Sequence, residues 1–171
     1  MGRVDPTHDL TVRAVDRRDL PLLERWQPTG ASAVHETRVA RVEEGASTYL
    51  VAFDGAGPVG SCEVRWDGPP APEVSDGVPE VNGLQVWPQE RQGSGVGSRL
   101  LDHVEALVAG AGHRGVGLGV DPANEGALRL YRRRGYLDTG TRYPDRYTVV
   151  DDDGVRRESA DVVAWLVKPL P

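Results

Sequence analysis

The segment from Glu80 to Ser98 constrains the fold of this chain most, because it predicts a strand, a glycine-rich turn and a helix in direct succession. Apolar residues recur at helical spacing after the turn, at Leu100, Leu101, Val104, Leu107 and Val108. The glycines at positions 93, 95 and 97 therefore lie at a helix N-terminus, where unpaired N–H groups and the positive end of the helix dipole favour an anion. Glycine lacks the Cβ that would hold a bulky phosphate away from these amides. A phosphate-bearing ligand is thus the first functional hypothesis.

Two common phosphate-binding motifs do not match this segment. The P-loop of NTPases needs a glycine followed by lysine and then serine or threonine, and no glycine here is followed by lysine. The dinucleotide fingerprint Gly-x-Gly-x-x-Gly fails in both registers, because Ser98 and Leu100 stand where its third glycine belongs. These absences disfavour an NTPase and a dinucleotide-binding enzyme.

The pattern that remains resembles a known family. Gln92-x-x-Gly95-x-Gly97, preceded by Leu84-Gln-Val-Trp-Pro88, resembles the signature of the GNAT superfamily of N-acetyltransferases. A second segment, Asn124-x-x-Ala127-Leu128-x-x-Tyr131-x-x-x-Gly135-Tyr136, resembles the helix that follows the signature in that family. The two segments agree with the family in spacing, residue type and order.

The resemblance implies a fold and a co-substrate. The fold is one α/β (α+β) domain over residues 1–171, with a mixed central sheet of about six to seven strands, about four flanking helices and two parallel strands that splay apart. Acetyl-CoA would place its pyrophosphate on the backbone amides of residues 92–97, and its pantetheine would pair with the backbone of residues 84–86. The implied CoA-binding residues are Leu84, Gln85, Val86, Gln92, Gly93, Ser94, Gly95, Val96, Gly97, Asn124 and Tyr131.

Acetyl transfer to an amine needs a deprotonated nucleophile, a stabilised oxyanion and a proton for the departing thiolate. The resemblance assigns the oxyanion to the N–H of Val86 and the general acid to Tyr131; a core tyrosine is the alternative for Tyr131. Glu80 is the candidate base, because it lies six residues before Val86, as in histone-acetylating members of the family. Three alternatives stay open: Glu80 holds a cationic substrate, Glu63 is the base, or the enzyme has no dedicated base.

Two local patterns depart from the family. Asn82-Gly83 by itself resembles a hairpin turn, which would remove Glu80 from the signature strand. Gly119 stands where N-terminal acetyltransferases of ribosomal proteins carry a glutamate, and this disfavours that subgroup.

The leading hypothesis is therefore an acetyl-CoA-dependent N-acetyltransferase, in which the primary amine of a small molecule attacks the thioester directly. A protein or peptide N-acetyltransferase is the alternative enzyme. A non-catalytic acyl-CoA-binding regulatory module is the alternative from another class. Since paired subunits are common among the relatives, a homodimer is a prior expectation.

Composition narrows the partners and the compartment. The chain of 171 residues has 39% hydrophobic residues and no apolar run near the ~20 residues that a membrane span needs. Its first residues lack the hydrophobic segment of a signal peptide, so we expect a cytoplasmic protein. The lone Cys62 and four scattered histidines predict neither a disulfide nor a metal site. The net charge of −6 predicts no nucleic-acid partner and mildly favours cationic partners such as amines.

Hydrophobic patterns and capping residues predict the other elements. Strands are expected over residues 10–15, 48–53, 59–66, 116–120, 142–150 and 161–167, with hairpin turns at residues 54–57 and 151–154. The proline-rich stretch 67–79 predicts a loop, either an inert connector or part of substrate choice.

Three further helices are predicted from their N-terminal residues. Asp16 and Asp19 predict the start of a helix that runs through Trp26, and Ser32 predicts the cap of a second that runs through Glu44. Asp121 and Pro122 predict the start of the helix that carries Tyr131. The arginines at 132–134 suit the negative end of that helix better than a phosphate clamp.

Overall fold

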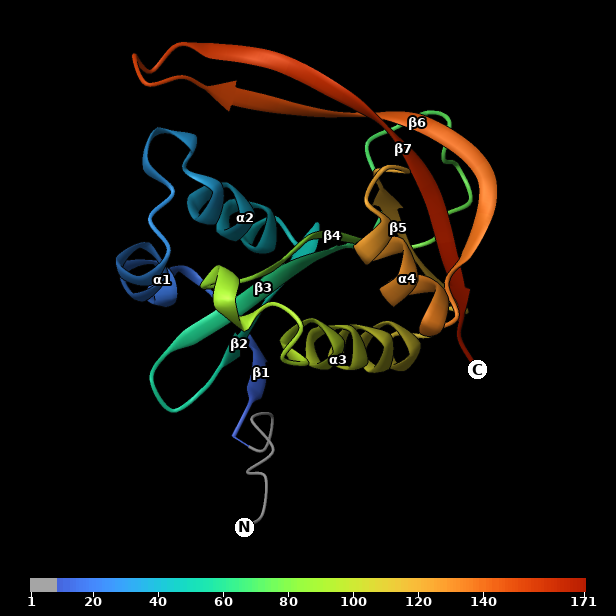
Figure 1. Ribbon diagram of the computed structural model, residues 1–171, viewed down its shortest axis with the longest axis horizontal. Coiled ribbons are helices and arrows are strands. Elements are labelled where there is room, and N and C mark those ends of the chain that lie inside the picture. The colour runs from blue at the N-terminus through green and yellow to red at the C-terminus, as the bar shows by residue number, and fades with distance from the viewer. Residues whose placement is uncertain (1–8) are drawn as a thin grey trace.

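The computed structural model describes residues 9–171; residues 1–8, which we expect not to form a signal peptide, lie outside the described residues. Seven strands form one mixed sheet in the order β1-β2-β3-β4-β5-β7-β6 (Figure 1). Their bounds are β1 Thr11–Ala14, β2 Ser47–Phe53, β3 Pro58–Arg65, β4 Glu80–Val86, β5 Gly115–Val120, β6 Leu137–Val150 and β7 Arg156–Pro169. The predicted class, a mixed α/β domain with a sheet of about six to seven strands, is confirmed.

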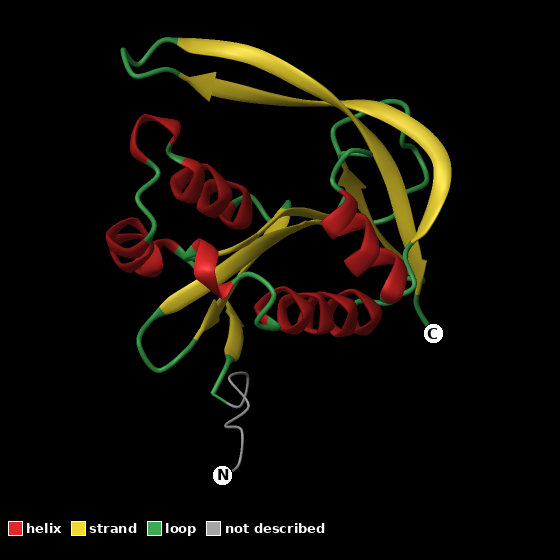
Figure 2. Ribbon diagram, in the orientation of Figure 1, coloured by secondary structure: helices red, strands yellow, loops and turns green. Residues whose placement is uncertain are grey.

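Within residues 9–171, four α-helices cover the two faces of the sheet, as Figure 2 shows. They are α1 Leu20–Trp26, α2 Val34–Glu43, α3 Val96–Gly110 and α4 Glu125–Arg133. Side-chain alternation in β2 explains the two layers, because Leu50 and Ala52 pack with α3 whereas Tyr49 and Val51 pack with Leu23 of α1 and Val39 of α2. Each face of β2 is therefore buried, and the core on the α3 side includes Val81, Leu84 and Val86 of β4.

The two parallel strands β4 and β5 touch at one end only. Their single pair of bridged residues is Glu80 and Gly117, and the Gly117 N–H donates to the Pro79 carbonyl over 2.9 Å. Every other pairing in the sheet is antiparallel and extends over several residues. Beyond Glu80 the strands diverge, which confirms the expected splay.

Asn82-Gly83 lies inside β4 and forms no hairpin turn. Asn82 faces Glu63 of β3, whereas Gln85 faces Ser61, so β4 carries one extra residue over this interval. Gly83 accommodates this bulge with a φ of 60°, a left-handed conformation that glycine adopts without steric cost. Glu80 therefore remains on the signature strand.

Two predicted helix caps are wrong. Ser32 belongs to a 3-10 turn, Gly30–Ser32, and its hydroxyl donates to the Thr29 carbonyl, so α2 begins after Ala33 without a side-chain cap. Asp121 accepts from the Ala123 N–H in a local turn, and Asn124 caps α4 by accepting from the Ala127 N–H. In both places a short turn satisfies the predicted capping side chain before the helix starts. The capping box of Asp16 and Asp19 is present, at a 3-10 turn that leads into α1.

The last two strands are longer than the pattern predicts. β6 and β7 span 14 residues each and pair from Leu137 with Val167 to Val150 with Arg156, with a register shift between Asp138 and Arg142, around the expected turn at 151–154. Figure 1 shows this hairpin bending past the sheet and over α2. Apolar side chains on it are exposed, at Tyr147, Val149, Val155 and Val162, so alternation there fails to mark the strand bounds.

Gly117 provides a test of how β5 packs. A Cβ at this position would overlap the indole ring of Trp165, which is buried and donates from Nε1 to Asp76 in the loop before β4 over 2.9 Å. We predict that Gly117→Ala lowers the free energy of unfolding by roughly 1–3 kcal/mol, because a well-packed core resists added methyl groups. Thermal unfolding followed by circular dichroism measures the effect.

Gly110→Ala is the matched control, because a Cβ there meets no atom within 4 Å at the end of α3. Its melting temperature should equal or exceed that of the parent. Equal stability of the two variants would contradict the packing role of Gly117.

Candidate active site

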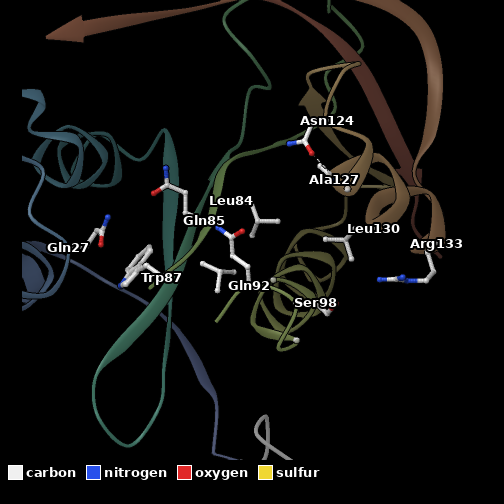
Figure 3. Close-up of a pocket in the computed structure, with 15 residues that line it drawn as sticks. Gln27, Leu84, Gln85, Trp87, Gln92, Ser98, Asn124, Ala127, Leu130 and Arg133 are labelled. Atoms are coloured by element: carbon white, nitrogen blue, oxygen red, sulfur yellow. Dashed lines mark hydrogen bonds between the residues drawn. The ribbon is translucent and has the colours of Figure 1, made fainter. Parts of the chain in front are cut away.

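A cavity of about 860 Å³ opens beside β4, where that strand leaves β5. It lies between the C-terminal half of β4, the N-terminus of α3 and one side of α4 (Figure 3). Its lining includes many residues that the sequence motifs single out: Leu84, Gln85, Val86, Gln92, Gly93, Gly95, Gly97 and Asn124. The two motifs, 27 residues apart from Gly97 to Asn124, thus meet around one space.

The glycine-rich turn presents backbone donors to this cavity. Gly93 and Gly95 have φ values of 79° and 94°, which turn the chain from the 3-10 turn Gln89–Arg91 into α3. No side chain caps α3. The first N–H groups of the helix, from Val96 onward, have no intrahelical acceptor, so they remain available to an anion.

Some predicted binding residues do not line the cavity through their side chains. Val96 is 1% exposed and packs in the core beneath the turn, and the Ser94 hydroxyl donates to the Arg91 carbonyl. Only the backbone of these two residues can serve a ligand. Neither Tyr131 nor Glu80 lines the cavity. Tyr131 is partly buried and packs against the core that contains Cys62 and Tyr136.

Tyr131 lies on α4 with its ring edge-on to Tyr136, the two centroids 5.8 Å apart. Burial and the nearby Cys62 raise the pKa of the Tyr131 phenol to about 12. The phenol therefore stays protonated at neutral pH and can donate a proton. Among the described residues it has no side-chain hydrogen-bond partner, so its proton is not committed within the fold.

Glu80 is 2% exposed at the point where β4 and β5 part. Arg65 of β3 donates from Nη1 to its Oε2 over 3.2 Å. Burial raises the pKa of the Glu80 carboxyl to about 7, against the opposing charge of Arg65. A carboxyl with such a pKa exchanges protons readily near neutral pH, which suits a general base.

Glu63 has the opposite environment. Its carboxylate is fully buried and accepts from Nε and Nη2 of Arg41 of α2 over 2.6 and 2.7 Å. Burial opposes its ionisation, but the hydrogen bonds and charge of Arg41, with Arg65 nearby, outweigh burial and lower the pKa of Glu63. Both oxygens are occupied in an ion pair, so Glu63 is suited to structure and poorly suited to proton transfer.

Several residues around the site were not predicted from the sequence. Gln27, Trp87, Ser98, Gly126, Leu130 and Arg133 also line the cavity. Arg133 is exposed in the last turn of α4 and also lines the cavity, whereas its neighbour Arg134 pairs with Asp102 and Glu105 of α3. Gln27 follows α1 and reaches the site only through the tertiary fold, which no local pattern indicates.

Tyr143 of β6 is a second missed residue. Its hydroxyl is buried without a hydrogen-bond partner in the described part of the chain, and it lies where a Cβ of Gly119 would stand. Gly117 and Gly119 thus make room for Trp165 and Tyr143 on one face of β5. The alternating glycines of this strand have a packing cause.

Within residues 9–171, no three His, Cys, Asp or Glu side chains are grouped as metal ligands. The helices of the same range include none that is long and apolar enough to cross a membrane.

Solved structures share this architecture. A GNAT family acetyltransferase from Elizabethkingia anophelis, solved with acetyl-CoA bound, aligns with a TM-score of 0.62 at 15% identity, over 95% of this chain and 99% of that one. A PaiA N-acetyltransferase from Thermoplasma acidophilum, in complex with coenzyme A, gives 0.61 at 15% identity, over 94% and 98%. A spermidine N-acetyltransferase chimera that includes the Vibrio cholerae enzyme gives 0.64 at 18% identity, over 94% and 95%.

At these low identities, the TM-scores establish a shared fold. The family model for the acetyltransferase (GNAT) family matches residues 12–136, which covers most of the chain and includes both motifs. The chain therefore belongs to the acetyltransferase (GNAT) family, whose enzymes use acetyl-CoA as co-substrate.

Proposed function

We propose that this acetyltransferase transfers the acetyl group of acetyl-CoA to the primary amine of a small molecule. The observation that carries the proposal is the convergence of the two motifs on one cavity, at the end of a strand pair that opens beside a buried carboxyl. The CoA complexes of the Thermoplasma and Elizabethkingia proteins support the choice of donor. Because Glu80 is 2% exposed, a slender acceptor fits better than a folded protein segment.

In this proposal the turn and the diverging strand hold the donor. The N–H groups at the start of α3 bind the pyrophosphate, and Arg133 and Asn124 line the same space from α4. The backbone of Leu84, Gln85 and Val86 pairs with the pantetheine arm as an added strand would. The thioester is thereby directed toward the gap between β4 and β5.

The chemistry divides between the two sides of β4. Glu80 takes the proton of the attacking amine through water, and the Val86 N–H stabilises the oxygen that gains charge. Tyr131 gives its proton to the departing thiolate. Val81 packs into the α3 core whereas Glu80, its neighbour, points to the other face, so base and acid approach the thioester from opposite sides.

The first test is turnover. We expect the protein to release free CoA thiol from acetyl-CoA when it is given a panel of amino acids, simple amines, polyamines, aminoglycosides and peptides. Thiol release with no member of the panel, while calorimetry still detects CoA binding, does not fit an enzyme. That outcome would favour the non-catalytic CoA-binding module. Acetylation of peptides alone would favour the protein-directed alternative.

A matched pair of variants locates the donor. Gly97→Glu places a carboxylate among the amide donors at a position with ordinary backbone geometry, and we expect it to weaken CoA binding at least about tenfold. Gly110→Glu carries the same charge at the other end of α3 and should leave the CoA affinity unchanged.

Glu80 provides a prediction of pH dependence. With a pKa of about 7 for the base, kcat/KM should rise with pH up to that value and then level off. Glu80→Gln should remove this rise and lower kcat about 10²-fold at neutral pH. Unchanged turnover at pH 7 in this variant would exclude Glu80 as the base.

The Glu80 carboxyl should raise activity but lower the stability of the fold as the pH rises. Its pKa in the folded state lies above the usual value, so its neutral form favours folding and this contribution fades as pH rises from about 4.5 to about 7. The melting temperature of Glu80→Gln relative to the parent should therefore increase between pH 5 and pH 8. A constant difference would place the pKa elsewhere.

Tyr131 is tested by removal of its hydroxyl. Tyr131→Phe should lower kcat about 10²-fold and leave CoA affinity unchanged, since a general acid contributes in the transition state. Tyr147→Phe, on the exposed part of β6, is the control and should keep full activity. Equal kcat in the two variants removes Tyr131 from the chemistry.

A further inference from the structure

Arg38 of α2 is a buried cation with few partners. The residue is 6% exposed, and its guanidinium carbon lies 5.3 Å from the centre of the Tyr49 ring. Its nearest carboxylate is that of Glu63, at 3.9 Å from Nε to Oε2. This separation exceeds a hydrogen bond, and Glu63 already accepts two short hydrogen bonds from Arg41.

The guanidinium of Arg38 thus makes no hydrogen bond within the part of the chain that the structure describes. None of its nitrogens is among the fully enclosed nitrogens without a partner in this range, which belong to Arg91 and Arg134, so each keeps a small exposed area that a ligand or water can reach. A buried guanidinium with unused donors is costly unless an acceptor reaches it. The fold therefore leaves the N–H donors of the Arg38 guanidinium available to an acceptor from outside the chain.

Gly83 defines where that space lies. A Cβ on Gly83 would overlap Nη2 of Arg38, so the bulge of β4 makes room for the guanidinium. Gly83 directly precedes Leu84, where the strand begins to line the cavity. Arg38 therefore reaches β4 next to the segment that we assign to the thioester arm.

We infer that the acceptor amine carries a carboxylate, which Arg38 binds, and that the substrate class is therefore amino acids. This inference rests on the proposed function. The planar guanidinium matches a carboxylate with two parallel N–H donors, and it contacts β4 at the residue directly before the cavity lining. The acetyl carbon forms a bond to the amine nitrogen and loses its bond to the CoA sulfur; the amine proton passes to Glu80, and the thiolate takes one from Tyr131.

The charges around Arg38 agree with an anionic acceptor group. Arg41 and Glu63 neutralise each other in their ion pair, and Arg65 pairs with Glu80. Among the described residues, Arg38 has no hydrogen-bonded anion. A polyamine, such as the substrate named for the spermidine enzyme above, would bring a second cation beside it.

Matched substrates test the inference in the parent enzyme. Each amino acid is compared with its carboxamide and with the amine that lacks the carboxyl group, and kcat/KM is measured from thiol release. We expect the acid to exceed both analogues about 10- to 100-fold, since a charged hydrogen-bonded pair is lost with either of them. If the carboxamides or simple amines are acetylated as well as the acids, the inference fails while the proposed function stands.

Variants assign the preference to Arg38. Arg38→Gln should bring the kcat/KM of the acid close to that of its carboxamide. The change should come from a higher KM for the acid, with kcat for the carboxamide unchanged. Arg38→Lys keeps the charge without the fork and should retain part of the preference. Arg17→Gln is the control, because it removes exposed ion pairs to Glu36 and Glu43 of α2, the helix that carries Arg38. It should keep the parent's ratio of kcat/KM between acid and carboxamide. If folded Arg38→Gln keeps the parent's kcat/KM ratio of acid to carboxamide, Arg38 does not bind the carboxylate.

Absence of turnover with every amine refutes the proposed function and the acetylation of amino acids with it. Binding then still separates the two ideas, because calorimetry with CoA-loaded protein measures affinity for each acid and its carboxamide. Equal affinities would overturn the carboxylate site itself. A preference for the acid that disappears in Arg38→Gln would support the site in a protein that binds without turnover.

Discussion

The single bridge between Glu80 and Gly117 is the constraint on which the site depends. Parallel strands that paired along their whole length would satisfy the amides of Leu84 to Val86 and close the cavity beside them. Here antiparallel pairing to β3 holds β4 on one side only, while β5 turns to β7. The gap therefore comes from sheet topology, and it leaves backbone donors unpaired where an extended ligand can use them.

Burial of charge on the α2 face follows from the same arrangement. Three arginines and two glutamates crowd the strands there, and they are not equivalent: Glu63 is locked to Arg41, Glu80 has its pKa raised by burial, and Arg38 keeps unused donors. The carboxyls differ through their partners and their distance from solvent. The site thus combines one fixed ion pair with two groups that remain free to act on a substrate.

Sequence reasoning succeeded where the cause was local or carried by a motif. The strand, turn and helix from Glu80 onward, and the two segments that meet at the cavity, lie where the patterns predict. It failed at Ser32 and Asp121, since each forms a turn of its own before the helix that it was expected to cap. It missed Gln27 and Tyr143, because no local sequence pattern indicates that residues far apart in the chain lie close together in the fold.

The sequence by itself determined the periodicities, the glycines that permit left-handed turns and the residue types available to bind phosphate and move protons. The tertiary structure alone decided that Asn82-Gly83 bulges within β4 instead of turning, that Glu80 is more easily neutralised than Glu63, and that Arg38 has no hydrogen bond to any described residue. The reason is physical. Hydrogen bonding, solvation and charge pairing depend on which distant groups surround a side chain, and only the packed fold fixes those neighbours.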